Sequence, residues 1–262
     1  MSVLVLDNVS INAWGADLIN KVSFSVDRGE LLAIIGPNGA GKTTLMNTVV
    51  NAGHKNQNIS GNITVCGQAY DAWSPEARAQ HVALLPQSSF LNFPYTVSEV
   101  IQLGRIPHAT GQLIDNAIIK HALSSLDISH LKERLYTQLS GGEKQRVQLA
   151  RVMVQIWRSE DAGKRLLLLD EPSSSLDLGH QQQLMTIIRE FANQGVAIVM
   201  VAHDINLVSQ YTDQLLALCC GEAIAQGRPN DVISSELMKK LYQVDVDVLS
   251  HPSNNKPLVV FK

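Results

Sequence analysis

One glycine-rich octapeptide dominates the sequence: Gly36-Pro37-Asn38-Gly39-Ala40-Gly41-Lys42-Thr43. It follows an apolar run at residues 31–35 and precedes a segment with helical spacing that begins near Lys42. Glycines give such a loop backbone conformations that other residues avoid, so its N–H groups can surround phosphate oxygens. The N-terminus of the following helix adds a partial positive charge, and Lys42 can reach the terminal phosphates. The pattern therefore predicts a phosphate-binding loop (P-loop) for a nucleoside triphosphate, with the Thr43 hydroxyl on Mg²⁺.

Two carboxylates follow a second apolar run. Residues 166–169 are all leucine, and Asp170 and Glu171 come directly after them. At the end of a strand, Asp170 can hold a water ligand of Mg²⁺, and Glu171 can accept a proton from an attacking water. Alone, the pattern is equally consistent with an ordinary strand end followed by a turn. Together with the P-loop, it favours a site that hydrolyses the nucleotide.

A third motif, Leu139-Ser140-Gly141-Gly142-Glu143, precedes a helix that we expect to extend to Gln155. Ser140 is a favourable helix N-cap, and the glycines let a phosphate approach the backbone. The motif resembles the signature of ATP-binding cassette (ABC) ATPases, and this resemblance covers residues 3–248. In that family the signature faces ATP held by a partner subunit. The resemblance therefore implies a head-to-tail homodimer, with each ATP between the P-loop of one copy and the signature of the other.

The resemblance also implies roles for isolated residues. Gln87 has the place of the family's Q-loop glutamine, and His203 follows an expected strand as the family's switch histidine does. Asp177 ends the sequence Ser-Ser-Leu-Asp, which resembles the D-loop at the dimer interface. An aromatic side chain near the N-terminus stacks on adenine in the family. Trp14 is the candidate for that role, with a place in the hydrophobic core as the alternative.

The family thus implies three sets of site residues. Catalytic roles fall to Lys42, Gln87, Glu171 and His203, and Mg²⁺ ligation falls to Thr43, Gln87 and Asp170. ATP contacts are implied for Trp14, Gly36, Pro37, Asn38, Gly39, Ala40, Gly41, Lys42, Thr43, Thr44, Ser140, Gly141, Gly142 and Asp177.

The order of segments predicts an α/β fold of the P-loop NTPase type. Alternating apolar residues before residue 27 predict an N-terminal antiparallel β-subdomain, and later apolar runs alternate with helices, which predicts a parallel core sheet. Helical spacing dominates residues 88–157, so we expect an inserted helical subdomain that carries the signature. Residues 1–87 and 158–262 would then form the nucleotide-binding core of a single ABC domain.

Further expectations concern segments outside these motifs. Residues 158–165 (RSEDAGKR) are polar and are expected to form an exposed loop. Cys219 and Cys220 end an apolar run and are expected to be small core residues. A hairpin around Gly221 and a helix over residues 235–242 should follow, with a last strand at residues 258–261. The remaining histidines are expected at the surface or as satisfied core residues: His54, His81, His108, His121, His130, His180 and His251.

Composition excludes several classes of protein. The chain has 262 residues, of which 45% are hydrophobic and 17% charged, so it is not disordered. Its 21 basic and 24 acidic residues give no footprint for nucleic acid. Three cysteines do not make a disulfide scaffold. We expect no secretory leader in the first residues, and every apolar run is far shorter than the roughly 20 residues that span a bilayer.

A finer resemblance indicates the class of transporter. Residues 82–87 (VALLPQ) and 202–207 (AHDINL) are similar to ATPases of iron-complex and cobalamin importers. Residues 93–100 (FPYTVSEV) and 104–108 (GRIPH) are similar to hemin importer ATPases. The resemblance implies a peripheral subunit at the cytoplasmic face of the bacterial inner membrane, which hydrolyses ATP to power hemin uptake.

The same resemblance implies partners and leaves alternatives open. The partners are a second copy of the chain, two transmembrane permease subunits and, indirectly, a periplasmic hemin-binding protein. The cargo could instead be a ferric siderophore or cobalamin. A soluble ABC ATPase without membrane subunits is the other alternative.

Overall fold

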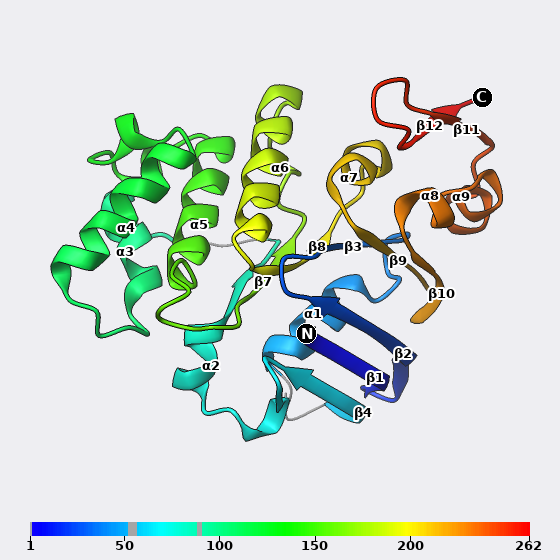
Figure 1. Ribbon diagram of the computed structural model, residues 1–262, viewed down its shortest axis with the longest axis horizontal. Helices are drawn as coiled ribbons and strands as arrows, with labels where there is room; N and C mark the ends of the chain where they lie inside the picture. Colours follow the sequence, from blue (N-terminus) through cyan, green and yellow to red (C-terminus); the bar gives the residue numbers. More distant parts are fainter. Residues whose placement is uncertain (1, 52–56, 88–90) are drawn as a thin grey trace.

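A six-stranded sheet forms the centre of the molecule in a computed structural model, which describes residues 2–51, 57–87 and 91–262 (Figure 1). Its strand order is β10-β9-β3-β8-β7-β6. Neighbours from β9 to β6 pair in parallel, and β10 pairs with β9 in antiparallel, which confirms the predicted parallel core sheet and the hairpin around Gly221. The strand bounds are β3 Leu31–Ile35, β6 Val82–Leu85, β7 Leu166–Asp170, β8 Ala197–Val201, β9 Gln214–Cys219 and β10 Glu222–Gly227.

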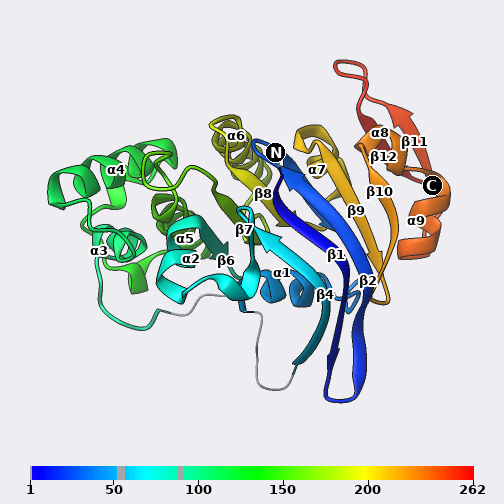
Figure 2. The same ribbon diagram turned by 60° about the horizontal axis from the view of Figure 1, so that its bottom comes forward.

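The N-terminal strands form a second, antiparallel sheet, as predicted. Its order is β2-β1-β4-β5, and its strands are β1 Ser2–Ala13, β2 Ala16–Asp27, β4 Gln57–Val65 and β5 Gln68–Ala69. Helix α1 (Lys42–Asn51) leaves the P-loop, and its Leu45, Met46 and Val49 are buried in the core that this sheet shares with the central sheet. Figure 2 shows β1 and β2 as one long hairpin in front of the central strands.

Both faces of the central sheet are buried, which explains its uninterrupted apolar runs. In β3, Leu31, Ala33 and Ile35 face the core formed with the helices, whereas Leu32 and Ile34 face the core shared with the antiparallel sheet. Successive side chains of a strand point to opposite faces, so one run of five apolar residues supplies both cores.

A further group of helices, which does not include α1, packs on the side of the central sheet away from the antiparallel sheet. In the described part of residues 88–157, α3 (Val97–Gln102), α4 (Gln112–Ser125) and α5 (Gly141–Gln155) form the group at one end of the molecule (Figure 1). Residues 88–90, where the expected subdomain begins, lie outside the described residues. Next in the chain come α6 (Leu178–Asn193) and α7 (Ile205–Tyr211). Helix α2 (Pro75–His81) was not predicted from the sequence.

The C-terminal segment packs beside α7. It contains α8 (Pro229–Val232) and α9 (Ser235–Tyr242), followed by β11 (Val246–Ser250) and β12 (Pro257–Phe261), which pair in antiparallel. The helix at residues 235–242 is confirmed, and so is the last strand. The side-chain amide of Asn206 in α7 donates to the carbonyl of Val259 and accepts from its N–H, which ties β12 to the core.

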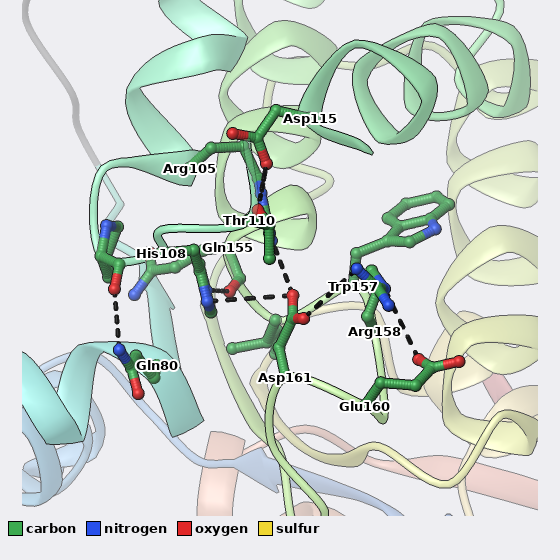
Figure 3. A network of polar contacts seen from close by, with 12 residues as sticks. Gln80, Arg105, His108, Thr110, Asp115, Gln155, Trp157, Arg158, Glu160 and Asp161 are labelled. Carbon is green, nitrogen blue, oxygen red and sulfur yellow. Dashed lines mark hydrogen bonds and ion pairs between the residues drawn. The ribbon is translucent and has the colours of Figure 1, made fainter. Parts of the chain in front are cut away.

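The expectation of an exposed loop at residues 158–165 is wrong for part of the loop. Arg165 is only 2% exposed, and the Asp161 side chain only 8%. Asp161 lies 2.9 Å from the guanidinium of buried Arg105, which also bonds Asp115 at 2.8 Å (Figure 3). Charged residues enter protein interiors when they are paired, and a composition of polar residues does not show whether partners exist.

Among the helices in the described ranges, none combines the length and the apolar character needed to cross a membrane. Of the scattered histidines, His108 is buried with Nε2 2.7 Å from the carbonyl of Gln155, as expected of a satisfied core residue. His54 lies outside the described residues.

Candidate nucleotide-binding site

The P-loop joins β3 to α1 and requires glycine at two positions. A Cβ on Gly36 would lie 2.0 Å from the carbonyl oxygen of Leu218 in β9, and one on Gly41 would lie 2.6 Å from Cδ1 of Ile19. Both glycines also have positive φ angles, +149° and +98°. Side chains would therefore displace the loop from the sheet, so packing as well as conformation explains these glycines.

Lys42, the first residue of α1, points back over the loop. Its Nζ donates to the carbonyl oxygens of Gly36 at 2.7 Å and Pro37 at 2.9 Å. Burial lowers the pKa of the Lys42 ammonium, and the charges of Glu171 and Asp170 act in the opposite direction. The ammonium is thus held at the centre of the loop, where a phosphate would enter.

The site contains an oxygen ligand suited to a hydrated cation. Asp170 ends β7 and is buried, and its Oδ1 has no hydrogen-bond partner among the described residues. The Thr43 hydroxyl donates to the same carboxylate, and burial raises the pKa of Asp170. An unpartnered carboxylate oxygen beside a threonine hydroxyl fits Mg²⁺, which binds through few protein oxygens and keeps several waters.

Glu171 is held from two sides. Its Oε2 accepts a hydrogen bond from Nε2 of Gln87 at 2.9 Å, and its Oε1 lies 2.5 Å from Nε2 of His203. These residues follow β6, β7 and β8, which are neighbours in the central sheet. A carboxylate oxygen accepts this hydrogen bond when the Nε2 of His203 carries a proton. The structure thus brings together the residues that the sequence analysis singled out for catalysis.

A cavity of about 660 Å³ lies between the P-loop and Glu171. Its lining residues are Asp17, Leu18, Asn38, Gly39, Gly41, Lys42, Thr43, Thr44, Gln87, Glu171, Cys220 and Gly221. Four of these, Asp17, Leu18, Cys220 and Gly221, were not predicted as site residues. They come from β2 and from the turn between β9 and β10, and no local motif distinguishes them.

Cys220 corrects the expectation that both neighbouring cysteines are core residues. It is exposed, has a positive φ of +49°, and lies in the turn where the apolar run of β9 ends. Cys219 is half-buried, and both thiols are free, with their Sγ atoms 3.9 Å apart. The chain reverses at Gly221, which carries Cys220 out of the core and onto the wall of the cavity.

Trp14 lies in the turn between β1 and β2 and is 78% exposed, so the alternative of a core tryptophan is wrong. It does not line the cavity, although Asp17, three residues later, does. Adenine stacking by Trp14 stays a prediction.

The signature lies apart from this cavity. Ser140 caps α5, since its hydroxyl accepts from the N–H of Glu143 and its own N–H donates to the Glu143 carboxylate at 2.7 Å. A Cβ on Gly142 would lie 3.2 Å from Cδ2 of Leu176, so the start of α5 packs against the D-loop. Asp177 in turn caps α6. None of Ser140, Gly141, Gly142 and Asp177 lines the cavity of its own chain.

Comparisons with known proteins agree with this geometry. The ABC transporter family matches residues 19–174. The hemin import ATP-binding protein HmuV of Pseudomonas fluorescens (strain Pf0-1) is 40% identical over 253 residues, covering 97% of each chain. HmuV of Gloeobacter violaceus is 41% identical over 254 residues, covering 96% of this chain and 91% of that protein.

Solved structures show the same fold. A metal-chelate type ABC transporter in an inward-facing conformation aligns with a TM-score of 0.80 at 24% identity, over all of this chain and 96% of that chain. An ATP-binding subunit of an ABC transporter aligns with a TM-score of 0.76 at 23% identity, over 87% of this chain and 91% of that chain. With its formed P-loop and a family match over more than half of its length, this chain belongs to the ABC transporter family and binds ATP.

Proposed function

We propose that this chain is the ATP-hydrolysing subunit of an ABC importer that powers hemin uptake across a bacterial inner membrane. The observation that carries hydrolysis is the position of Glu171, held by Gln87 and His203 beside the P-loop. The cargo is supported by the relatives from Pseudomonas and Gloeobacter, which are hemin import ATP-binding proteins and match nearly the whole chain.

In the proposed mechanism the P-loop amides and Lys42 bind the phosphates of ATP. Thr43, Asp170 and Gln87 would hold Mg²⁺, which neutralises charge on the phosphate oxygens when bound. Glu171 accepts a proton from the attacking water, and its hydrogen bonds to Gln87 and His203 orient its carboxylate. His203 and Lys42 stabilise the negative charge on the transferring phosphoryl group.

The site would be complete only in a head-to-tail homodimer. The signature residues lie outside the cavity of their own chain, and the space around a Cβ on Gly141 is open to 4 Å. A second copy can therefore present its P-loop and bound ATP to Ser140, Gly141 and Gly142. ATP then favours the closed pair because it contacts both surfaces only when they meet.

The helical end of the molecule carries the surface that we assign to the permease. Phe93 is 63% exposed there, and four other apolar side chains are exposed along the same part of the chain: Tyr95, Ile106, Leu113 and Ile114. Isolated exposed apolar residues are common, but the rings of Phe93 and Tyr95 lie side by side, with centroids 6.1 Å apart, and adjacent exposed apolar side chains favour an interaction surface. We assign residues 88–157 to a subdomain that moves with two transmembrane permease subunits, on the cytoplasmic face of the membrane.

ATPase activity in proteoliposomes tests the proposal. The liposomes hold the chain with its cognate permease subunits, with or without the heme-loaded periplasmic binding protein, and E171Q is the control. Stimulation by the heme-loaded protein together with heme uptake, both lost in E171Q, is the expected result. Stimulation only by a binding protein loaded with a ferric siderophore or cobalamin would overturn the cargo. If the ATPase activity of the chain were the same with and without the permease subunits, the role in transport would be overturned.

A further inference from the structure

The C-terminal helix reaches the first residue of the P-loop. The hydroxyl of Tyr242, the last residue of α9, accepts a hydrogen bond of 3.0 Å from the backbone N–H of Gly36. Tyr242 lies far outside residues 19–174, where the family match ends. The contact therefore joins the nucleotide site to a segment that its sequence motifs do not include.

Gly36 needs this partner because it lies just beyond the ladders of the central sheet. The pairing of β3 with β8 ends at Ile34, and its pairing with β9 ends at Ile35. Gly36 is buried and packs closely against β9, since even a Cβ on this residue would lie 2.0 Å from the carbonyl oxygen of Leu218. A buried N–H without an acceptor is costly, so the Tyr242 hydroxyl satisfies a donor that the sheet leaves unpaired.

Gly36 also accepts the hydrogen bond that positions Lys42. The Lys42 Nζ donates to the Gly36 carbonyl at 2.7 Å, while the Gly36 N–H donates to Tyr242. The tyrosine hydroxyl, the backbone of Gly36 and the ammonium thus form one chain of contacts, through the two peptide groups that meet at the Gly36 Cα. A shift of Gly36 would move the carbonyl that holds the ammonium.

The side chain of Tyr242 is itself held in place. Leu237, Met238 and Leu241 bury α9 in the helical core, and Tyr242 packs half-buried against the same core. Burial raises the pKa of the Tyr242 hydroxyl, and the hydrogen bond from Gly36 partly opposes this, so the group stays neutral at physiological pH. Its other side borders a cavity of about 440 Å³ that His203 also lines.

We propose that Tyr242 is a positioning residue for the nucleotide, which acts by fixing the backbone of Gly36 and through it Lys42. The C-terminal segment then contributes to ATP binding through Tyr242. The inference rests on ATP binding, which the family shares. Of its two tests, only the measurement of KM and kcat also rests on the proposed function, ATP hydrolysis.

The test compares Y242F with Y211F in the full-length protein. Phenylalanine keeps the ring of Tyr242 and removes only the acceptor, and Tyr211 is a half-buried tyrosine of α7 packed against the same core. We expect Y242F to weaken ATP binding by about 5- to 30-fold in calorimetry, the loss that one unsatisfied buried donor produces. Y211F should bind within about twofold of the wild type.

Kinetics separates positioning from general damage. Because Lys42 contacts the phosphates both before and during the reaction, Y242F should raise KM for ATP about tenfold and change kcat by less than about threefold. A damaged fold would instead lower kcat at unchanged KM, through loss of active protein. Wild-type affinity and KM in Y242F would overturn the proposal. If the wild type binds but does not hydrolyse ATP, the proposed function fails, while calorimetry still decides the role of Tyr242.

Discussion

The guanidinium of Arg105 and the carboxylate of Asp161 form a buried ion pair, with Nη2 and Oδ2 2.9 Å apart. Arg105 also donates to the carbonyl of Val154 in α5 and to Asp115 in α4. The loop before β7 is thereby tied to the helical end of the molecule (Figure 3). Asp161 belongs to the loop before β7, whereas Arg105 and Asp115 belong to the helical end. The ion pair between Asp161 and Arg105 therefore joins the two parts of the molecule.

Removal of the Asp161 carboxylate should destabilise the fold. D161A leaves Arg105 buried with one carboxylate partner instead of two, and we expect the free energy of unfolding to fall by about 2–4 kcal/mol. Urea denaturation measures this. E160A is the matched control, since Glu160 is exposed and its carboxylate contacts Ser159 at 3.5 Å and Arg158 at 3.6 Å, so its effect should stay within about 0.5 kcal/mol. Equal midpoints for the two variants would contradict the structural role of the pair.

Glu171→Gln should separate binding from chemistry. The amide keeps the size of the side chain but cannot accept a proton from water, so we expect phosphate release to slow by about 10²- to 10⁴-fold. ATP affinity should remain within about threefold of the wild type, because Lys42 and the P-loop amides are unchanged. Single-turnover hydrolysis and calorimetry measure the two quantities. A variant that hydrolyses at the wild-type rate would remove Glu171 from the mechanism.

Gly141→Asp tests the role of a second copy. An aspartate fits in the single chain, because outside its own helix and its chain neighbours no described residue has an atom within 4 Å of a Cβ at this position, and so stability and ATP binding should be preserved. In a head-to-tail dimer its carboxylate would meet the phosphates of the partner's ATP, and ATPase activity should fall more than about 100-fold. G163D, also in open space, is the control. Comparable activity in both variants would argue against the dimer.

The thiols should differ in reactivity. Cys220 is exposed on the wall of the nucleotide cavity, whereas burial raises the pKa of the Cys66 thiol to about 11. Thiolate is the reactive form, so near pH 8 Cys66 stays protonated and should react slowly, and faster as the pH rises toward 11. Mass spectrometry after brief alkylation should find Cys220 modified first, and ATP should protect it. If saturating ATP did not slow the alkylation of Cys220, the nucleotide would not bind in the cavity that Cys220 lines.

Phe93→Asp should uncouple the subunit from its permease. Phe93 is exposed on the proposed docking surface and does not line the nucleotide cavity, so the basal ATPase rate of the isolated chain should not change. Stimulation by permease in proteoliposomes should fall at least about tenfold. L249D, a charged substitution at an exposed apolar residue of β11, is the control. If F93D retained transport, or if L249D lost as much stimulation by permease as F93D, the docking surface would not lie at Phe93.

Local chemistry made the motifs predictable. The P-loop, the acids after β7 and the cap of α5 each depend on a few consecutive residues, and the strands that position them are buried on both faces and therefore uniformly apolar. Residues that depend on distant partners were not predictable in the same way. Asp161 is polar in a polar loop, and only Arg105, 56 residues earlier in the chain, explains its burial.

Strand β11 could not be predicted from its own sequence either, because it too depends on a partner elsewhere in the chain. Its sequence, Val-Asp-Val-Leu-Ser, is short and mostly exposed, and its pairing with β12 decides its conformation. In the site, Asp17 and Gly221 line the cavity through the packing of two hairpins. The residues next to Asp17 and Gly221 in the sequence form no motif that would indicate a binding site.

The hydrogen bond between Gly36 and Tyr242 also has a consequence for how the protein is made. The two residues are 206 positions apart, so a ribosome that adds roughly 5–20 residues per second needs about 10–40 s to produce the second after the first. During that interval the P-loop has emerged without its C-terminal support. A nascent chain should therefore acquire its full affinity for ATP only at the end of synthesis, after α9 has left the ribosome.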